Sequence, residues 1–306
     1  MDENKNLVSA GAAIVRRNKR YVVWFYLLNL AFARFGAGAF NNAAHSVLDH
    51  SLYADKLLHG FNGAVFIEVL ARPEFGALAS STAPATMFAF VFFLASLVFM
   101  PGVLLGYASD HRLPRDEFYR ACGRNVWRFV RLFVFFTIIA GIISGILFGA
   151  LNALVTAADK TSNERLPFFT QFGGIVIILL VLTIVRIWFD LAQAEVVLRD
   201  QPAVRKAIAA GFGKTRRNLG RLLGSYVVIA IVAVAVLVVG IFLWHAIVPP
   251  SSVLGAFIIG QAMMLLLLAT RFWQRATAVA FYVREMTEPV VEEARPVPTF
   301  ATPVVF

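Results

Sequence analysis

Residues 222–248 read LLGSYVVIAIVAVAVLVVGIFLWHAIV, and this run contains no Lys, Arg, Asp or Glu. A helix needs roughly 20 predominantly apolar residues to cross a hydrocarbon core about 30 Å thick. Lipid offers no partners for free backbone N–H and C=O groups, so a single chain segment that crosses it must pair those groups within a helix. The run therefore predicts a membrane-spanning α-helix.

Five further runs have a similar length and composition. They occupy residues 21–40, 85–107, 129–155, 170–190 and 253–275. The whole sequence is 59% hydrophobic and 15% charged, with a mean hydropathy of +0.73, which is more apolar surface than the core of a soluble protein buries. We therefore predict an all-α integral membrane protein with six transmembrane helices.

The 28 Lys and Arg residues are spread unevenly between these runs. Five precede the first run, the successive connections with the adjoining helix ends and the C-terminal region then hold 2, 6, 2, 7, 0 and 4, and Arg34 and Arg186 lie inside runs. By the positive-inside rule, this alternation predicts a protein of the bacterial inner membrane with both termini in the cytoplasm. The expected organisation is a basic cytoplasmic segment (1–20), a membrane domain (21–285) with an outer loop (41–84), and a disordered cytoplasmic tail (286–306).

The first apolar run has a second interpretation. Small residues at Ala37, Gly38 and Ala39 follow a basic and then an apolar stretch, as in a cleaved signal peptide. The run is nevertheless long for the apolar region of a signal peptide, and Arg34 interrupts its end. We therefore favour a retained transmembrane helix.

Short sequence patterns recur at similar places along the chain. Arg16-Arg17-Asn18, Gly123-Arg124-Asn125 and Arg216-Arg217-Asn218 precede the first, third and fifth runs, while Arg186-Ile187-Trp188 and Arg271-Phe272-Trp273 lie at the ends of the fourth and sixth. These matches favour three helical hairpin repeats, each with a basic interfacial helix, a span outward and a span back. The alternative is that membrane-facing helix ends converge on Arg, Asn and Trp because lipid headgroups favour them.

Two connections carry basic residues at helical spacing beside apolar ones, and we expect both to form basic interfacial helices along the cytoplasmic leaflet. The residues expected to contact lipid headgroups or a partner are Arg120, Arg124, Arg128, Arg131, Arg205, Lys206, Lys214, Arg216, Arg217 and Arg221. Each basic side chain near an anionic surface contributes roughly 1 kcal/mol to binding, so membrane lipids with anionic headgroups are the simplest partner. A membrane protein partner, or plain anchoring that only sets the topology, would use the same residues.

Polar and small residues inside the runs suggest two further features. Arg186 and Asp190 lie four residues apart on one helical face and are expected to form an intramembrane polar pair, either structural or part of a substrate or proton site. Gly141, Gly145 and Gly149 form a smooth ridge for helix packing, which we expect to be filled within the chain, with an oligomer interface as the alternative.

No pattern of residues predicts catalysis or a cofactor. The sequence lacks a Walker loop, a dinucleotide glycine fingerprint, a GxSxG motif and a set of metal-binding carboxylates. His45 and Asp49 in the outer loop lack a metal-ligand spacing, and we expect this loop to cap the bundle. The lone Cys122 has no nearby histidine to act as its base. We expect no catalytic residue, no metal, no cofactor and no nucleic-acid partner.

The stretch from Arg186 through Trp188, Asp190 and Ala192, followed by Arg199-Asp200 and a basic helix that ends in Arg-Arg-Asn, resembles a loose group of bacterial six-span inner-membrane proteins. These include proteins labelled as glycerophosphodiester-phosphodiesterase-type membrane domains. The likeness covers the second half of the chain. Because a soluble phosphodiesterase domain and its metal-binding carboxylates are missing from the sequence, the resemblance implies no hydrolase activity.

Three functional hypotheses follow. The first is a non-enzymatic multi-pass protein that binds anionic lipid or a membrane partner as a scaffold or envelope factor. The second is a transporter or permease subunit with a polar path near Arg34 and Arg186. The third is an intramembrane lipid-modifying enzyme, which would need catalytic polar groups that converge at one leaflet.

Overall fold

The structure, a computed structural model, describes residues 6–38, 41–42, 45, 48–49, 64, 67, 78–161, 163, 165–249 and 252–287. Over these residues the fold is all-helical, as predicted. The helices whose first and last residues the structure describes are α1 (Leu7–Arg17), α2 (Lys19–Gly36), α7 (Leu78–Ala108), α8 (Arg115–Asp159), α9 (Leu166–Leu198), α10 (Val204–Arg217), α11 (Leu219–Ile247) and α12 (Val253–Thr287).

The predicted outer loop and tail fall mostly outside the described residues. At the C-terminal side of the loop, residues 78–84 belong to α7, and Met286 and Thr287 of the predicted tail belong to α12. The structural predictions for 288–306 and for most of 41–77 lie outside what the structure describes.

Five of the helices are long and apolar enough to cross a membrane. They are the Ala85–Ala108 part of α7, together with α8, α9, α11 and α12. Large apolar side chains such as Ile146 on α8, Phe172 on α9 and Phe242 on α11 are exposed on their surfaces. Lipid is the solvent that suits such surfaces, so the chain is a multi-pass membrane protein.

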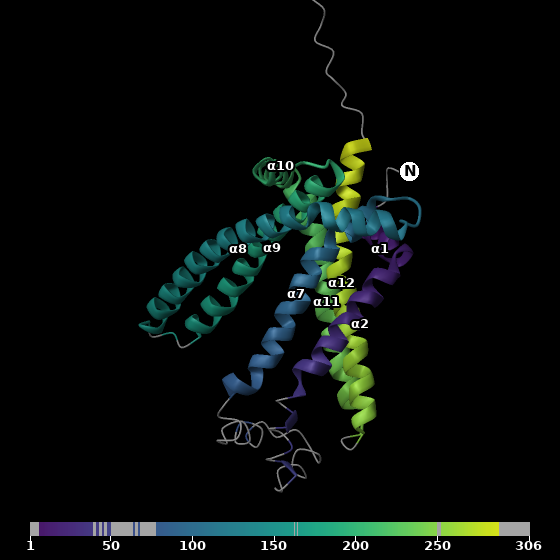
Figure 1. Cartoon of the computed structure of the whole chain (residues 1–306). Helices are drawn as coiled ribbons and strands as arrows, with labels where there is room; N and C mark the ends of the chain where they lie inside the picture. The colour runs from purple at the N-terminus through teal and green to yellow at the C-terminus, as the bar shows by residue number, and fades with distance from the viewer. Residues whose placement is uncertain are drawn as a thin grey trace, which may run out of the picture.

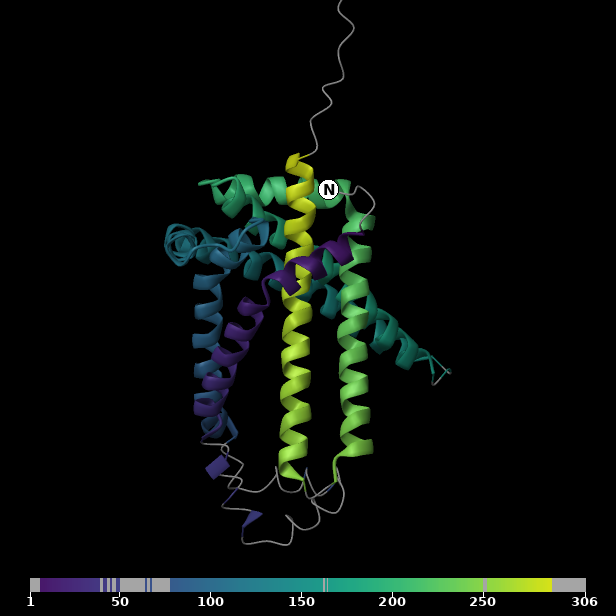
Figure 2. The same cartoon turned by 90° about the vertical axis from the view of Figure 1, so that its right-hand side faces the viewer.

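The helices form a main bundle, a projecting hairpin and two crossing helices. α2, α7, α11 and α12 run alongside one another, and α8 and α9 form a long antiparallel hairpin that projects away from them (Figure 1). α1 and α10 lie across one end of the bundle (Figure 2). The helix-to-helix connections at 109–114 and 199–203 lie at this same end, which we call the basic end for reasons given below.

The core of the molecule lies near the basic end. Tyr107, Phe129, Ile187, Tyr226 and Tyr282, from five different helices, are all almost fully buried. Their positions show that α7, α8, α9, α11 and α12 converge there. Away from this end the helices present much more of their surface to lipid, and the core is correspondingly thin.

The two crossing helices are held by the same kind of contact. Trp273 Nε1 of α12 donates a hydrogen bond to the Val8 carbonyl of α1 at 2.8 Å, and Trp188 Nε1 of α9 donates one to the Ile208 carbonyl of α10 at 2.7 Å. A glycine follows each carbonyl by three residues. Gly11 lies directly against Thr277, and a Cβ at Gly211 would lie 2.8 Å from the carbonyl oxygen of Trp188.

The glycine ridge on α8 does not pack as expected. Outside α8 itself, no described atom lies within 4 Å of a Cβ placed on Gly141, Gly145 or Gly149. Among the described residues, the ridge is therefore not filled as expected. In the α8–α9 hairpin the close approach uses Gly174 of α9, whose free space the Leu151 side chain fills.

The close contact at Gly211 leads to a stability test. In Gly211→Ala the new methyl group would press on the backbone of α9, so we expect a loss of roughly 1–3 kcal/mol, as is usual for overpacking. This loss acts against the gain of about 1 kcal/mol that alanine brings to a helix interior. Thermal unfolding of the purified protein in detergent measures the net change in stability of Gly211→Ala relative to the wild type.

Gly213→Ala is the matched control, because a Cβ at Gly213 meets no atom within 4 Å. It should keep or raise the unfolding temperature. Equal unfolding temperatures for the two variants would show that α10 is not held closely against α9.

Candidate functional site

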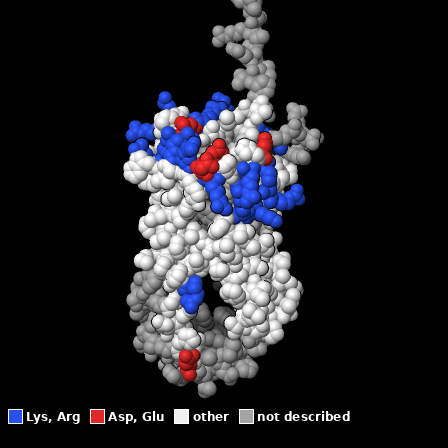
Figure 3. Space-filling view, turned by 45° about the vertical axis from the view of Figure 1, so that its right-hand side comes forward, with Lys and Arg blue, Asp and Glu red and all other residues white. Residues whose placement is uncertain are grey.

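Charge is concentrated at one end of the molecule. Lys and Arg side chains gather around the end crossed by α1 and α10, above a broad band that shows neither basic nor acidic side chains (Figure 3). A few cations on described residues, namely Arg34, Lys160 and Arg165, lie on segments at the opposite end. Since charge is costly in hydrocarbon, this distribution places the basic end at a membrane surface.

Two of the arginines expected to contact lipid are tied down within the chain. Asp200, at a φ of 50° in the connection after α9, accepts a 2.6 Å hydrogen bond from Arg128 Nη1 and lies 3.5 Å from Arg124 Nη1. The hydrogen bond from Arg128, helped by the charge of Arg124, holds the pKa of the Asp200 carboxyl below its ordinary value. These contacts fasten the α9–α10 connection to α8.

Lys214 was expected to face headgroups, and the structure corrects this. Its Nζ is closed off from solvent and lies 3.4 Å from Glu195 Oε2 and 3.0 Å from Glu285 Oε2. It also sits 3.9 Å from the ring centroid of Tyr282, whose hydroxyl donates a 2.6 Å bond to Glu195. Two carboxylates and an aromatic face compensate the buried ammonium, so Lys214 joins α10 to α9 and α12.

The other basic residues expected at this end remain exposed. Arg131 lies 5.5 Å from the ring centroid of Trp127. The remaining six form no ion pair within the part of the chain that the structure describes, and we call them the rim cations: Arg120, Arg205, Lys206, Arg216, Arg217 and Arg221. Their side chains are available to an external anion.

The polar pair expected on α9 lies within a larger buried cluster. Arg186 Nε is 3.8 Å from Asp190 Oδ2, and the same oxygen accepts a 2.8 Å hydrogen bond from the Tyr226 hydroxyl of α11. Arg275 of α12 lies within electrostatic range of Asp190, and its Nε has no hydrogen-bond partner among described atoms. This arrangement links α9, α11 and α12 through a largely buried Asp190 side chain.

Neither a metal site nor a reactive thiol emerges from the described residues. They contain no group of three or more His, Cys, Asp or Glu side chains able to hold a metal ion. The Nδ1 of His45 lies 3.1 Å from Asp49 Oδ2, which is an isolated pair. Cys122 is buried, with its Sγ 3.8 Å from the Phe99 carbonyl oxygen.

Several residues of this end were missed by the sequence reasoning. Asp200 and Glu195 stand out in the sequence as acids within a basic stretch, and that contrast could have marked them as internal ion-pair partners. Tyr226 and Arg275 carry no such signal, because their partner Asp190 is far away in the chain. A pocket bordered by Arg20, Arg112 and Arg115 was also missed, because Arg20 is about ninety residues away from the other two in the chain.

The Asp200 contacts predict a pH-dependent stability difference. Asp200→Asn removes the carboxylate that holds Arg128, so the variant should unfold at a lower temperature at pH 7. A carboxyl whose pKa is lowered by folding stabilises the folded state above its unfolded pKa of about 3.9, and this contribution disappears as the pH falls through the lower, folded value. The difference between the unfolding temperatures of wild type and variant should therefore begin to shrink below about pH 4 and vanish below the folded pKa of Asp200.

Asp159→Asn is a suitable control, since Asp159 forms no ion pair with any described residue. It should match the wild type over the whole pH range. A constant gap between wild type and Asp200→Asn down to pH 3 would mean that the Arg128 contact does not act through the charge of Asp200.

We compared the chain with known protein families, curated proteins and solved structures. No family model, curated protein or solved structure matches it. The resemblance to bacterial six-span proteins therefore stays a prediction.

Proposed function

We propose that the chain is a non-enzymatic, six-span protein of the bacterial inner membrane that binds anionic lipid through its basic end and serves as a scaffold or envelope factor. The observation that carries this proposal is the division among the cations of the basic end. Some are neutralised by buried or nearby carboxylates, whereas the rim cations have no acidic partner within the described residues. A set of exposed, unneutralised cations at headgroup level suits an anionic surface.

The crossing helices support this proposal. α1 buries Leu7 and Gly11 against the bundle, and α10 buries Val204, Ala207 and Gly211, while both helices keep basic residues in their last turns. An amphipathic helix with cations on its exposed side is the usual design for lying in the headgroup region. Each cation near anionic lipid adds roughly 1 kcal/mol, so several together can outweigh the loss of lipid mobility.

α2 supplies the sixth span in this proposal. It contains Lys19, Arg20 and Arg34 and is shorter than the five helices described above. Its aromatic contacts nevertheless follow α7 through much of the membrane, since Tyr21 meets Tyr107 near the basic end and Phe32 meets Phe88 toward the other end. A helix that accompanies a span over this depth must itself cross most of the hydrocarbon.

We also propose that the domain contains three hairpin repeats. The contacts of α1 and α10 recur at a constant offset of 200 residues, as the pairs Val8 and Ile208, Gly11 and Gly211 show. The side chains of Asn18, Asn125 and Asn218 each donate to the carbonyl four residues earlier, at 3.2, 3.0 and 3.3 Å.

The hairpin around α8 departs from the other two. α8 continues through Asn125 without a break, and the glycine at its crossing contact, Gly102, lies on α7 and faces Phe118 of α8. Here the glycine lies on α7 and the large residue on α8, whereas the glycines of the other two contacts lie on the crossing helices α1 and α10. The two helices still approach closely. This departure explains why the sequence likeness between the three hairpins is short.

The lipid proposal is tested by the lipid that co-purifies with the protein. Arg216→Gln combined with Arg217→Gln removes two rim cations, and we expect several-fold less anionic phospholipid per protein, because each lost cation weakens the attraction by roughly 1 kcal/mol. Lipid mass spectrometry of the detergent-extracted protein gives the ratio of phosphatidylglycerol to phosphatidylethanolamine.

The matched control is Lys160→Gln combined with Arg165→Gln, which removes two cations from the opposite end. Its lipid ratio should equal that of the wild type. An unchanged ratio in the Arg216 and Arg217 variant would contradict the proposed lipid binding by the rim.

The proposed topology is tested by labelling single cysteines in a Cys122→Ser background. A membrane-impermeant maleimide added to intact cells should label Thr161→Cys, because the α8–α9 connection is proposed to lie outside, and should leave Ser109→Cys unlabelled. Asn6→Cys should also be protected, whereas Gly38→Cys should react, because α2 is proposed to cross the membrane between them. Labelling of Asn6→Cys from outside would rule out α2 as the sixth span.

The transporter and enzyme alternatives receive less support. A transport path would need the polar residues of the spans to converge, yet Asn152 and Gln171 are exposed on the projecting hairpin and Gln261 is bonded to the Tyr26 hydroxyl at 2.9 Å. The acidic side chain best placed for proton chemistry, Asp190, is committed to Arg186 and Tyr226.

A further inference from the structure

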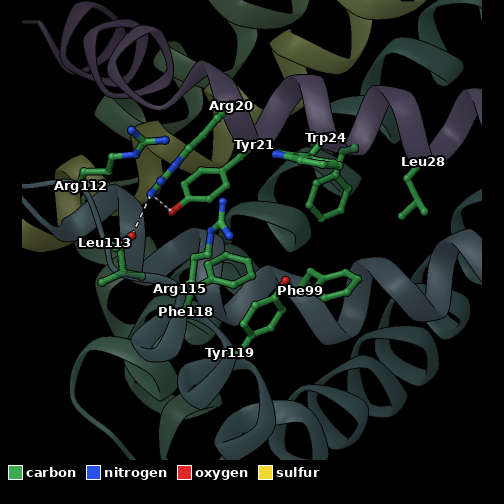
Figure 4. A pocket seen from close by; sticks show the side chains of 11 residues that line it. Arg20, Tyr21, Trp24, Leu28, Phe99, Arg112, Leu113, Arg115, Phe118 and Tyr119 are labelled. Carbon is green, nitrogen blue, oxygen red and sulfur yellow. Dashed lines mark hydrogen bonds between the residues drawn. The ribbon is translucent and has the colours of Figure 1, made fainter.

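A pocket of about 630 Å³ opens beside α2 at the basic end. α2 contributes Arg20, Trp24 and Leu28 to its lining, α7 contributes Phe99, and the segment that leads into α8 contributes Arg112 and Arg115 (Figure 4). Sites for small molecules usually measure roughly 300–1,000 Å³, so this pocket has room for a ligand of that size.

The polar part of the pocket consists of three guanidinium groups. Arg20 is held in place, because its Nη2 donates to the Tyr21 hydroxyl at 2.9 Å and to the Leu113 carbonyl at 3.3 Å. Arg112 and Arg115 are exposed at the mouth of the pocket. Arg20 is thus fixed in position, whereas the exposed Arg112 and Arg115 side chains can adjust to a ligand.

These three arginines have no carboxylate partner among the described residues. The nearest acids along the chain are Asp110, Asp116 and Glu117, and none of them forms an ion pair with the pocket arginines; Asp110 lies 3.6 Å from Arg17 instead. Arg124, Arg128 and Lys214 at the same end are all neutralised by carboxylates. Over the described residues, the positive charge of the pocket is therefore not compensated, which favours an anionic ligand.

Guanidinium groups select the kind of anion. Their planar, forked donors match phosphate oxygens in pairs, and this geometry makes arginine a preferred residue for phosphate recognition. Arg20 still has donors that are not used by Tyr21 and Leu113, since a guanidinium carries five N–H groups. A phosphate between Arg20, Arg112 and Arg115 would balance their charge.

The remainder of the pocket is apolar and points toward the membrane interior. In Figure 4, Arg20 and Arg112 lie at one side and Trp24 and Leu28 at the other. Leu28 is eight residues beyond Arg20 on α2, which is about 12 Å along a helix axis. Because α2 leads away from the basic end, this part of the pocket lies deeper in the membrane.

Two exposed aromatic side chains flank this apolar part. Trp24 is 69% exposed and Tyr119 is 62% exposed, and they stand on α2 and α8 respectively. Trp and Tyr are enriched where headgroups meet acyl chains, since one part of each ring system is apolar and another is polar. A free phosphate would leave these aromatic walls without a partner, whereas an acyl chain would cover them.

We propose that this pocket binds a single anionic phospholipid, with its phosphate between Arg20, Arg112 and Arg115 and its acyl chain along Trp24, Leu28 and Phe99. The inference rests on the proposed lipid-binding function and adds to it a specific site, separate from the rim cations. The rim attracts anionic lipid in general, while the pocket retains one molecule.

The test uses the full-length protein, stripped of bound lipid in detergent and titrated with phosphatidylglycerol under native mass spectrometry. Arg112→Gln combined with Arg115→Gln is the pocket variant, because both side chains are exposed and form no hydrogen bond or ion pair with another described residue. Lys160→Gln combined with Arg165→Gln is the matched control, because it removes the same charge from the opposite end, away from both the pocket and the rim. Arg20 is left intact, because its bonds to Tyr21 and Leu113 join α2 to the segment before α8.

We expect the wild type and the control to retain one phosphatidylglycerol with similar affinity, and the pocket variant to bind it at least tenfold more weakly. Trp24→Ala should also weaken phosphatidylglycerol binding, since it removes part of the acyl-chain wall without changing the charge. Phosphatidylcholine, which has no net charge, should bind the wild type at least tenfold more weakly than phosphatidylglycerol does.

Three results would each overturn the inference. They are equal affinity of the pocket variant and the control, equal affinity of the wild type for phosphatidylcholine, and complete displacement of phosphatidylglycerol by equimolar glycerol phosphate, which would reveal a site for soluble phosphate. The rim is tested separately by the Arg216 and Arg217 variant. A pocket variant that binds normally beside a rim variant that loses bulk anionic lipid therefore contradicts the pocket alone.

Discussion

The structure depends on the cost of placing charge in hydrocarbon. A lysine or arginine at the centre of a bilayer costs a few kcal/mol even by the lowest scales, so basic residues must lie at a membrane surface or be paired inside the protein. Both solutions occur at the basic end. The rim cations stay at the surface, while Lys214 lies between Glu195 and Glu285 and Arg128 is bound to Asp200. The same constraint leaves a band of the surface free of charge (Figure 3).

Polar contacts at the basic end connect helices that the hydrophobic effect alone would hold poorly. Lipid tails are as apolar as leucine, so helices in a membrane gain little from apolar contact with each other. At the basic end the connecting contacts are polar: Trp188 and Trp273 bond to the carbonyls of the crossing helices, and Tyr226 bonds to Asp190. These bonds coincide with the densest part of the core. The α8–α9 hairpin has fewer of them away from this end, and there it projects from the bundle (Figure 1).

The sequence predicts those features that depend on neighbouring residues, and it fails for contacts between residues that are far apart in the chain. The length of an apolar run decides whether a helix can span a bilayer, so the runs at 85–107, 129–155, 170–190, 222–248 and 253–275 correspond to helices with that capacity. The first run is less clear, because Lys19, Arg20 and Arg34 reduce its apolar character. The role of Lys214 depends on Glu285, which is distant in the chain, and helical periodicity placed it with the exposed cations. The glycines show the same limit: the spaced set at 141, 145 and 149 meets no other helix among the described residues, while the isolated Gly11 and Gly211 lie at crossings.

The pocket beside α2 shows why neutralisation matters more than the number of cations. Sequence reasoning gave most weight to the dense basic stretches, but in a dense stretch the structure also brings acids close, as it does at Arg124 and Arg128. Arg20, Arg112 and Arg115 are few, yet they converge from two segments around one cavity, and no described carboxylate lines it. An anion bound there meets the guanidinium of Arg20, which is already held by Tyr21 and Leu113, so less binding energy is lost to ordering that side chain. A specific site for one amphiphile and a general attraction for a charged leaflet can therefore exist on the same end of one molecule.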